Sequence, residues 1–179
     1  MAIPTFVIIW IYPIIFVPYD FIATFVRRMR ANVDDYTAQA TTLDSFSQAY
    51  NDRMAARKTD LITATMTRSR EELNRPVRVL EIGSGSRANF AFYPPGTKVI
   101  CVDPNWKCES YLRKFAEMFP DVTLEASIVG CGEKLEGVDD GSIDVVVVTL
   151  TLCTVNDVDQ CLKEIIRVLR PVSINIHGY

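Results

Sequence analysis

The sequence predicts an α/β fold with a doubly wound, mainly parallel sheet, preceded by an N-terminal membrane-anchoring helix. Short β-branched runs alternate with helical stretches from Val77 onward, and the four consecutive valines at 145–148 form a run apolar enough to be buried on both faces. The N-terminus is set apart because no charged residue precedes Asp20. We therefore divide the chain into a hydrophobic membrane anchor (1–30), an amphipathic helical segment (31–75) and a partial α/β domain (76–179).

The first 26 residues have the composition of a membrane anchor. A helix of the uncharged residues 1–19 would be about 28 Å long, close to the thickness of the hydrocarbon core of a bilayer. Three arginines at 27–30 follow the apolar run, which is typical of an uncleaved anchor and predicts that the rest of the chain faces the cytosol. Three prolines would bend a helix here, so a re-entrant or single-leaflet anchor and a buried hairpin are alternatives to a straight span. We expect residues 1–26 to contact membrane lipids.

Residues 31–75 are more polar, and their apolar side chains recur at helical spacing between Leu43 and Met66. This spacing predicts one long or two short amphipathic helices. Asp44 or Ser45 is a candidate N-terminal cap, and residues 74–76, which include a proline, are the expected end. We expect the segment to pack on the α/β domain; a lid over a ligand site is the alternative.

Four strands and two helices are expected in the remaining chain. The β-branched runs place the strands at 77–82, 98–102, 122–128 and 143–149, and apolar periodicity places the helices at 109–118 and 158–169. Residues 173–177 would add only a stub of a fifth strand. We therefore expect an exposed apolar edge at the fourth strand or at this stub, which favours aggregation.

Two strand ends carry the residues of a candidate cofactor site. The first strand ends in Glu81-Ile-Gly83-Ser-Gly85, where the glycines allow the backbone to turn tightly and to approach a ligand. Asp103 ends the second strand and follows Gly83 by twenty residues, the spacing at which a carboxylate accepts hydrogen bonds from both ribose hydroxyls. Because ligands of such sheets bind at the carboxyl ends of the strands, the two features together indicate a cofactor that contains adenosine.

The identity of this cofactor has two candidates. Gly83-x-Gly85-x-x-Ala88 also satisfies the permissive dinucleotide pattern, so a nicotinamide oxidoreductase is an alternative. Glu81 suits the ammonium of an amino acid headgroup, and Arg87 stands where a pyrophosphate would need close approach. These two residues favour S-adenosylmethionine.

Composition excludes several partner classes. The formal net charge is −3 and the pI is about 5.2, so no strongly basic field is available to hold nucleic acid. The five cysteines form no C-x-x-C pair and His177 is the single histidine, so we expect no metal site. We expect the cysteines to be reduced and mostly buried.

At these motifs the chain resembles the methyltransferase-like protein seven (thiol S-methyltransferase) family, within the type-eleven class I S-adenosylmethionine-dependent methyltransferases. The matching stretches are LEIGSGS at 80–86, NFAFYPPG at 89–96, CVDPN at 101–105, DGSIDVVVV at 140–148, TLTLCTV at 149–155 and RVLRP at 167–171. The resemblance implies a Rossmann-like fold, S-adenosyl-L-methionine as cofactor and a small, lipophilic thiol as methyl acceptor. It also implies an endoplasmic reticulum membrane location with the catalytic domain facing the cytosol, and an association with lipid droplets.

The resemblance further implies roles at the strand ends. The glycine turn and Glu81 would line the methionine end of the cofactor, Asp103 would hold the ribose, residues 104–105 and the backbone of Gly132 would contact the adenine, and residues 149–150 would lie near the methyl group. The candidate cofactor-binding residues are Glu81, Gly83, Ser84, Gly85, Asn89, Asp103, Pro104, Asn105, Gly132, Glu133, Thr149 and Leu150. No catalytic base is named, because a sulfonium activates its own methyl group and a thiolate is a strong nucleophile.

Cys131 replaces an acidic residue of the family, which removes one possible contact to the adenine amine. Two other departures support a second interpretation: Arg87 replaces a glycine, and the chain ends before the last strands that the family adds after Arg170-Pro171. The sequence therefore looks like a C-terminally truncated methyltransferase. A catalytically impaired, membrane-associated pseudo-methyltransferase fragment is the alternative function.

Overall fold

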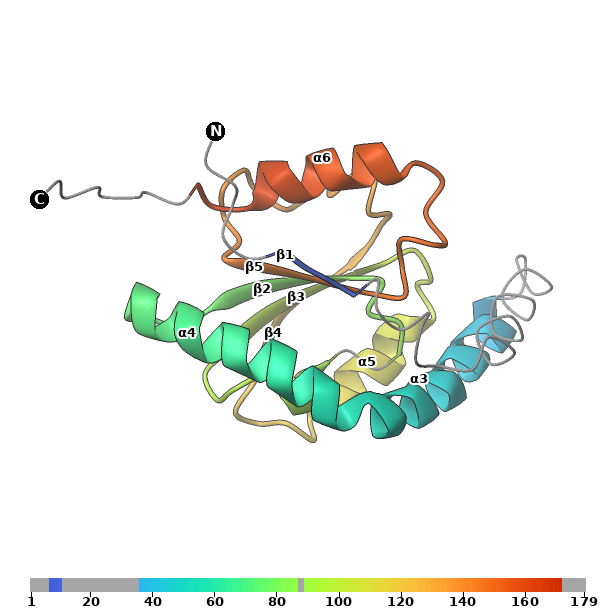
Figure 1. Ribbon diagram of the computed structural model, residues 1–179. Coiled ribbons are helices and arrows are strands. Elements are labelled where there is room, and N and C mark those ends of the chain that lie inside the picture. Colours follow the sequence, from blue (N-terminus) through green and yellow to red (C-terminus); the bar gives the residue numbers. More distant parts are fainter. Residues whose placement is uncertain (1–6, 11–35, 87–88, 172–179) are drawn as a thin grey trace, which may run out of the picture.

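The computed structural model describes residues 7–10, 36–86 and 89–171, which form three layers (Figure 1). A five-stranded sheet in the order β1-β5-β2-β3-β4 lies in the middle, and every neighbouring pair is parallel. Helices α3, α4 and α5 cover one face and α6 covers the other (Figure 1). The prediction of a doubly wound parallel sheet is confirmed.

The four predicted strands of the α/β domain form close to their expected positions. They are β2 (Arg78–Ile82), β3 (Lys98–Asp103), β4 (Thr123–Val129) and β5 (Val145–Thr149). The four valines of β5 are at most 1 % exposed, as expected for a strand that is covered on both faces. Ile143 lies outside the strand and forms an isolated bridge with Leu169.

The edge of β5 is covered by an N-terminal strand that sequence analysis did not predict. Strand β1 (Val7–Trp10) pairs in parallel with β5, from Val7 opposite Val146 to Trp10 opposite Thr149. The prediction of a helix through residues 7–10 was therefore wrong, as was that of an exposed edge at the fourth strand. The open edge of β5 has backbone N–H and C=O groups that need partners. The four β-favouring residues VIIW supply these partners when they form a strand.

The other residues of the predicted anchor and the 173–177 stub lie outside the described residues. No helix within 36–86 or 89–171 is long and apolar enough to cross a bilayer.

The segment before the α/β domain is one long helical rod. It consists of α3 (Tyr36–Lys58), one π-helical stretch η1 (Thr59–Thr63) and α4 (Ala64–Leu73). Asn74 ends the rod with a left-handed φ of 50°, and its N–H donates to the carbonyl of Arg70. Of the two predicted arrangements, one long helix or two short ones, the structure shows a continuous rod, and its predicted end at 74–76 is confirmed. The predicted cap at Asp44 or Ser45 was wrong, because the helix already begins at Tyr36.

The remaining helices close two apolar cores. Helix α5 (Cys108–Ala116) and the short η2 (Phe90–Phe92) share one core with the long rod, and α6 (Val158–Val168) closes the other. Asp157 caps α6 by accepting a 2.9 Å hydrogen bond from the N–H of Gln160.

An ion-pair network closes the opposite, amino-terminal edge of the sheet. Asp144, whose side chain is 3 % exposed, accepts two hydrogen bonds from Arg75 at 2.7 and 2.8 Å, one from the N–H of Arg78 and one from Arg170, both at 2.9 Å. Burial alone would raise the pKa of Asp144, but these donors and the two guanidinium charges hold it below its usual value. The Asp144 carboxylate thus connects the residue that follows the rod, the start of β2 and the segment after α6.

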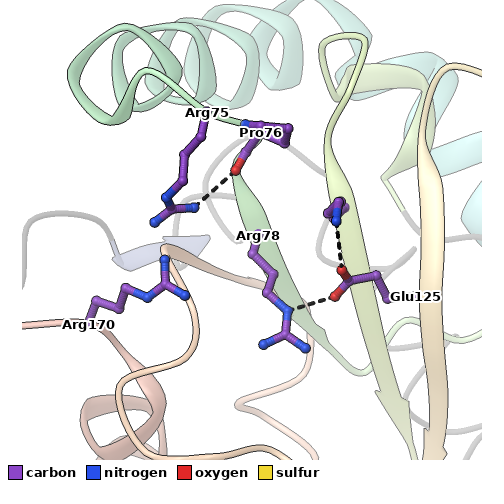
Figure 2. A pocket seen from close by; sticks show the side chains of 6 residues that line it. Arg75, Pro76, Arg78, Glu125 and Arg170 are labelled. Carbon is purple, nitrogen blue, oxygen red and sulfur yellow. Dashed lines mark hydrogen bonds and ion pairs between the residues drawn. The ribbon is translucent and has the colours of Figure 1, made fainter.

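A cavity of about 260 Å³ adjoins this network (Figure 2). Its lining includes Arg78 and Lys98, which both pair with Glu125, at 2.6 and 3.5 Å. The cavity lies at the amino ends of the strands, away from the predicted cofactor site. Because acidic side chains already pair with its basic ones, we interpret it as part of the network that joins these segments.

We expect Asp144→Asn to lower the free energy of unfolding by about 2 kcal/mol, because the buried residue 144 would no longer be a charged acceptor for Arg75 and Arg170, whose side chains are partly exposed. Urea unfolding measures the change. Asp140→Asn is the control, since Asp140 is exposed and pairs with Arg167 at the surface, and we expect less than about 1 kcal/mol. Since the folded pKa of Asp144 is lowered, its contribution is present near neutral pH and is lost as the pH falls through that pKa. A constant difference down to strong acid would contradict this.

Candidate functional site

The ends of β2 and β3 form a backbone turn that is closed by a carboxylate. Gly83 and Gly85 have φ values of 71° and 57°, a region that glycine adopts without a steric penalty. The N–H of Gly83 donates to the carbonyl of Val102 at 2.7 Å. Asp103 accepts 2.8 and 2.9 Å hydrogen bonds from the N–H groups of Gly85 and Asn105, one on each oxygen. The predicted convergence of the glycine turn and Asp103 is confirmed.

The Asp103 carboxylate keeps hydrogen-bonding capacity for a ligand. Each of its oxygens accepts one backbone hydrogen bond and has a further lone pair for a second donor. Burial raises the pKa of Asp103, while the two backbone donors oppose that rise. In the same turn, Ser84 is buried beside the Cys101 thiol. The remaining lone pairs of the Asp103 carboxylate fit the vicinal hydroxyls of a ribose.

A side chain from beyond β5 locks the glycine turn in place. Thr151 Oγ1 donates a 3.0 Å hydrogen bond to the carbonyl of Ile82. A Cβ added at Gly83 would lie only 2.0 Å from that oxygen. Gly83 is therefore required both by its positive φ and by close packing against Thr151.

The predicted methyl-transfer residues lie at the tip of β5, beside the same turn. Leu150 has a φ of 57°, an uncommon conformation for a branched, non-glycine residue. The hydroxyl of Thr149 accepts a 3.3 Å hydrogen bond from Asn89 Nδ2, which links the strand tip to the end of the glycine loop. The structure thus brings the tips of β2, β3 and β5 together at one edge.

Glu81 is 2 % exposed and is held by protein groups. Its carboxylate accepts hydrogen bonds from the Asn89 N–H at 3.0 and 3.1 Å, from Asn89 Nδ2 at 2.7 Å and from the Tyr93 hydroxyl at 2.6 Å. Burial raises the pKa of Glu81, and these donors together with the charge of Lys58 oppose the rise. The described contacts make Glu81 an internal anchor of the loop, and its predicted contact with a cofactor headgroup stays a prediction.

Lys58 and Tyr93 belong to this network and were missed as site residues. Lys58 donates to Asn89 Oδ1 at 2.5 Å and is 1 % exposed. A signal in the sequence could have identified Lys58, because it interrupts a buried stripe at four-residue spacing. The members of that stripe are Tyr50, Met54, Lys58, Ile62 and Met66.

The predicted adenine-side residues are only partly brought together. Pro104 is exposed, and the buried Asn105 accepts a hydrogen bond from the Lys107 N–H at the start of α5. Gly132 is buried, and a Cβ there would lie 2.8 Å from Cys161 Sγ. Glu133 accepts a 2.7 Å hydrogen bond from the Asn156 N–H, so its carboxylate holds the loop before α6. The predicted cofactor contact of Glu133 stays a prediction.

The thiols have no disulfide partner within the described residues. Three of the five, at positions 101, 108 and 161, are buried, while Cys131 and Cys153 are exposed. Across the described ranges, no group of three or more His, Cys, Asp or Glu side chains could hold a metal ion. Arg87, the departure in the glycine loop, lies outside the described residues.

Residues 80–176 match the methyltransferase domain family, Methyltransf_11. The chain belongs to this family. The family implies S-adenosylmethionine as the cofactor, and it favours this cofactor over the nicotinamide alternative. The remaining lone pairs of the Asp103 carboxylate fit its adenosine part.

The chain is also similar to curated proteins that are named thiol S-methyltransferases. The chain is 41 % identical over 129 residues to human thiol S-methyltransferase TMT1A, covering 70 % of this chain and 51 % of that protein. It is 47 % identical over 95 residues to thiol S-methyltransferase TMT1B of Rattus norvegicus, covering 53 % of this chain and 39 % of that protein. The chain thus spans about half or less of the length of these relatives.

Solved structures confirm the fold. The CurJ carbon methyltransferase superposes with a TM-score of 0.62 at 17 % identity, covering 85 % of this chain and 45 % of that one. Monomeric WbdD superposes with a TM-score of 0.53 at 18 % identity, covering 69 % of this chain and 32 % of that one. At these identities the likeness concerns the architecture, a Rossmann-like methyltransferase fold.

We expect Gly83→Ala to lower the free energy of unfolding by about 3 kcal/mol, because its positive φ is unfavourable for alanine and its Cβ would overlap Thr151. Thermal unfolding of the full chain measures the change. Gly96→Ala is the control: Gly96 has a φ of 85°, but its Cβ would meet nothing closer than 4.0 Å, so we expect about 1 kcal/mol. Equal losses in the two variants would show that Thr151 does not constrain the turn.

Proposed function

We propose that this chain is an S-adenosylmethionine-dependent methyltransferase that acts on a small, lipophilic thiol. The observation that carries the proposal is the hydrogen bond between the Gly85 N–H and the Asp103 carboxylate at the carboxyl edge of the sheet. It is supported by membership of the methyltransferase domain family and by the similarity to proteins named thiol S-methyltransferases.

We assign cofactor-binding roles by position along this edge. Asp103 accepts hydrogen bonds from the ribose hydroxyls, and the backbone of Gly83 and Gly85 lies along the methionine part. Residues 104–105 and the buried backbone of Gly132 contact the adenine. When bound, S-adenosylmethionine supplies a methyl group already activated by its positive sulfur, so the chain has to align donor and acceptor rather than activate them.

The acceptor side is formed by the tip of β5. Thr149 and Leu150 lie beside the glycine turn and would border the transferred methyl group. No histidine lies within the described residues, and a thiol that enters as a thiolate needs no general base. A thiol acceptor is therefore compatible with the side chains present at this edge.

We expect Asp103→Asn to weaken the binding of S-adenosylhomocysteine about 10- to 100-fold, because hydrogen bonds to a charged group contribute about 1.5–3 kcal/mol each. Isothermal titration calorimetry of the full chain measures the affinity. Asp121→Asn is the control, since Asp121 is exposed at the other end of the sheet, before β4. Unchanged affinity in Asp103→Asn would refute the proposed site. Cofactor binding without turnover of a simple thiol such as thiophenol would favour the impaired pseudo-methyltransferase.

We also propose that the N-terminal apolar segment attaches the chain to the endoplasmic reticulum membrane, and to lipid droplets, with the catalytic domain in the cytosol. Support comes from the lack of charge before Asp20 and from the arginines that follow. Because Val7–Trp10 is paired in the sheet, we assign the lipid contact to residues 11–26, and a helix of that length would be about 24 Å long. This is shorter than a bilayer core of about 30 Å, so we favour insertion into a single leaflet.

We expect the full chain to float with phosphatidylcholine vesicles in a density gradient. The double variant Ile14→Lys, Phe16→Lys should stay in the dense fraction, because each lysine inserted into the apolar region costs up to about 3 kcal/mol. Ile166→Lys is the matched control, since Ile166 is an exposed apolar residue of α6. Equal flotation of the double variant and the control would contradict the attachment through residues 11–26.

A further inference from the structure

Lys58 is a buried charge at the junction of the N-terminal rod and the cofactor edge. It lies at the end of α3, where the helix passes into η1, and is 1 % exposed. A buried ammonium is costly unless it is paired and hydrogen-bonded. The groups that surround Lys58 therefore indicate its role.

The partners of Lys58 connect the rod to the glycine loop. Its Nζ donates to Asn89 Oδ1 at 2.5 Å and to Asn51 Oδ1 at 2.6 Å. The same ammonium lies 4.8 Å from the ring centre of Tyr50 and 5.3 Å from that of Phe92, within cation–π range. The rod thus binds directly to the residue that ends the glycine loop.

Asn89 also forms hydrogen bonds with residues at the ends of two strands, β2 and β5. While its Oδ1 accepts from Lys58, its Nδ2 donates to Glu81 at 2.7 Å and to Thr149 at 3.3 Å. The orientation of the Asn89 amide is fixed by this arrangement, because only the oxygen can accept from an ammonium. The Asn89 side chain therefore connects the rod, β2 and the predicted methyl-transfer end of β5 by hydrogen bonds.

We propose that Lys58 is a positioning residue of the cofactor site, which acts through Asn89 to set the glycine loop against the tip of β5 and whose positive charge balances the buried Glu81. The inference rests on the proposed function and extends it, because it places a required part of the site in the helix before the family domain. No cofactor contact of Lys58 itself is needed.

Because the proposed role depends on the charge of Lys58, it predicts that the effect of Lys58 on cofactor binding changes with pH. Burial lowers the pKa of Lys58 to about 8, although the negative charge of Glu81 raises it. The other titratable groups around this pair are the phenols of Tyr50 and Tyr93 and the thiol of Cys101, and burial raises the pKa of each. Among the described residues, Lys58 is therefore the group of this cluster that loses its charge just above neutral pH.

The test compares full-length Lys58→Met with the wild type by calorimetry with S-adenosylhomocysteine between pH 6.5 and 9.5. At pH 7 we expect Lys58→Met to bind about tenfold more weakly, the effect of losing one hydrogen bond to a charged group. The ratio of the two affinities should shrink above pH 8, where wild-type Lys58 also becomes neutral. Taking the ratio cancels the titration of the ligand's own amino group. Arg57→Met, the same change at the exposed neighbouring position, should bind like the wild type at every pH.

Two further variants separate positioning from folding. Lys58→Met, Glu81→Gln removes both buried charges, so it should melt at a higher temperature than Lys58→Met while binding remains weak. Lys58→Arg keeps a positive donor and should recover part of the affinity. If Lys58→Met or the double variant binds as tightly as the wild type, the inference is overturned while the proposed function stands. If Asp103→Asn also leaves binding unchanged, the proposed function itself fails.

Discussion

The organisation of the cofactor edge depends on one buried carboxylate. Glu81 lies in a parallel strand between the buried apolar residues Leu80 and Ile82, and an ionised group there requires compensation. The compensation comes from Asn89 and Tyr93, which follow in the chain, and from the charge of Lys58 on the preceding helix. To satisfy Glu81 the chain must fold the segment after the glycine loop back over β2. The same requirement that stabilises the carboxylate therefore fixes the shape of the loop.

Sequence reasoning located the strands well because their signals are local. Four β-branched runs became four strands within two residues of their expected starts, and the valines of β5 indicated a strand buried on both faces. The pairing of Gly85 with Asp103 could also be anticipated. Parallel neighbouring strands end at the same edge, so residues far apart in the chain meet there once the strand order is known.

The features that were not predicted share a physical cause. Each depends on a contact with a residue that is far away in the sequence. Residues 7–10 are uncharged and β-favouring, and they fit either an apolar helix or a strand until the open edge of β5 is known. Lys58 was passed over because a charge in an amphipathic segment is usually solvated, whereas its partner Asn89 lies 31 residues further on. The hydrogen bond from the Asn156 N–H to Glu133 was not predicted either, because it depends on a loop conformation that no local pattern specifies.

The strained tip of β5 fits a reaction that depends on alignment. A left-handed backbone at Leu150 costs about 1 kcal/mol or more, and it persists because neighbouring contacts fix both sides of it. On one side Asn89 holds Thr149, and on the other Thr151 is bonded to β2 and packed against Gly83. In-line transfer of an activated methyl group gains most from holding two reactants at a fixed distance and angle. A strand tip braced from both sides, at the edge where the proposed ribose-binding carboxylate lies, fits that requirement for rigidity.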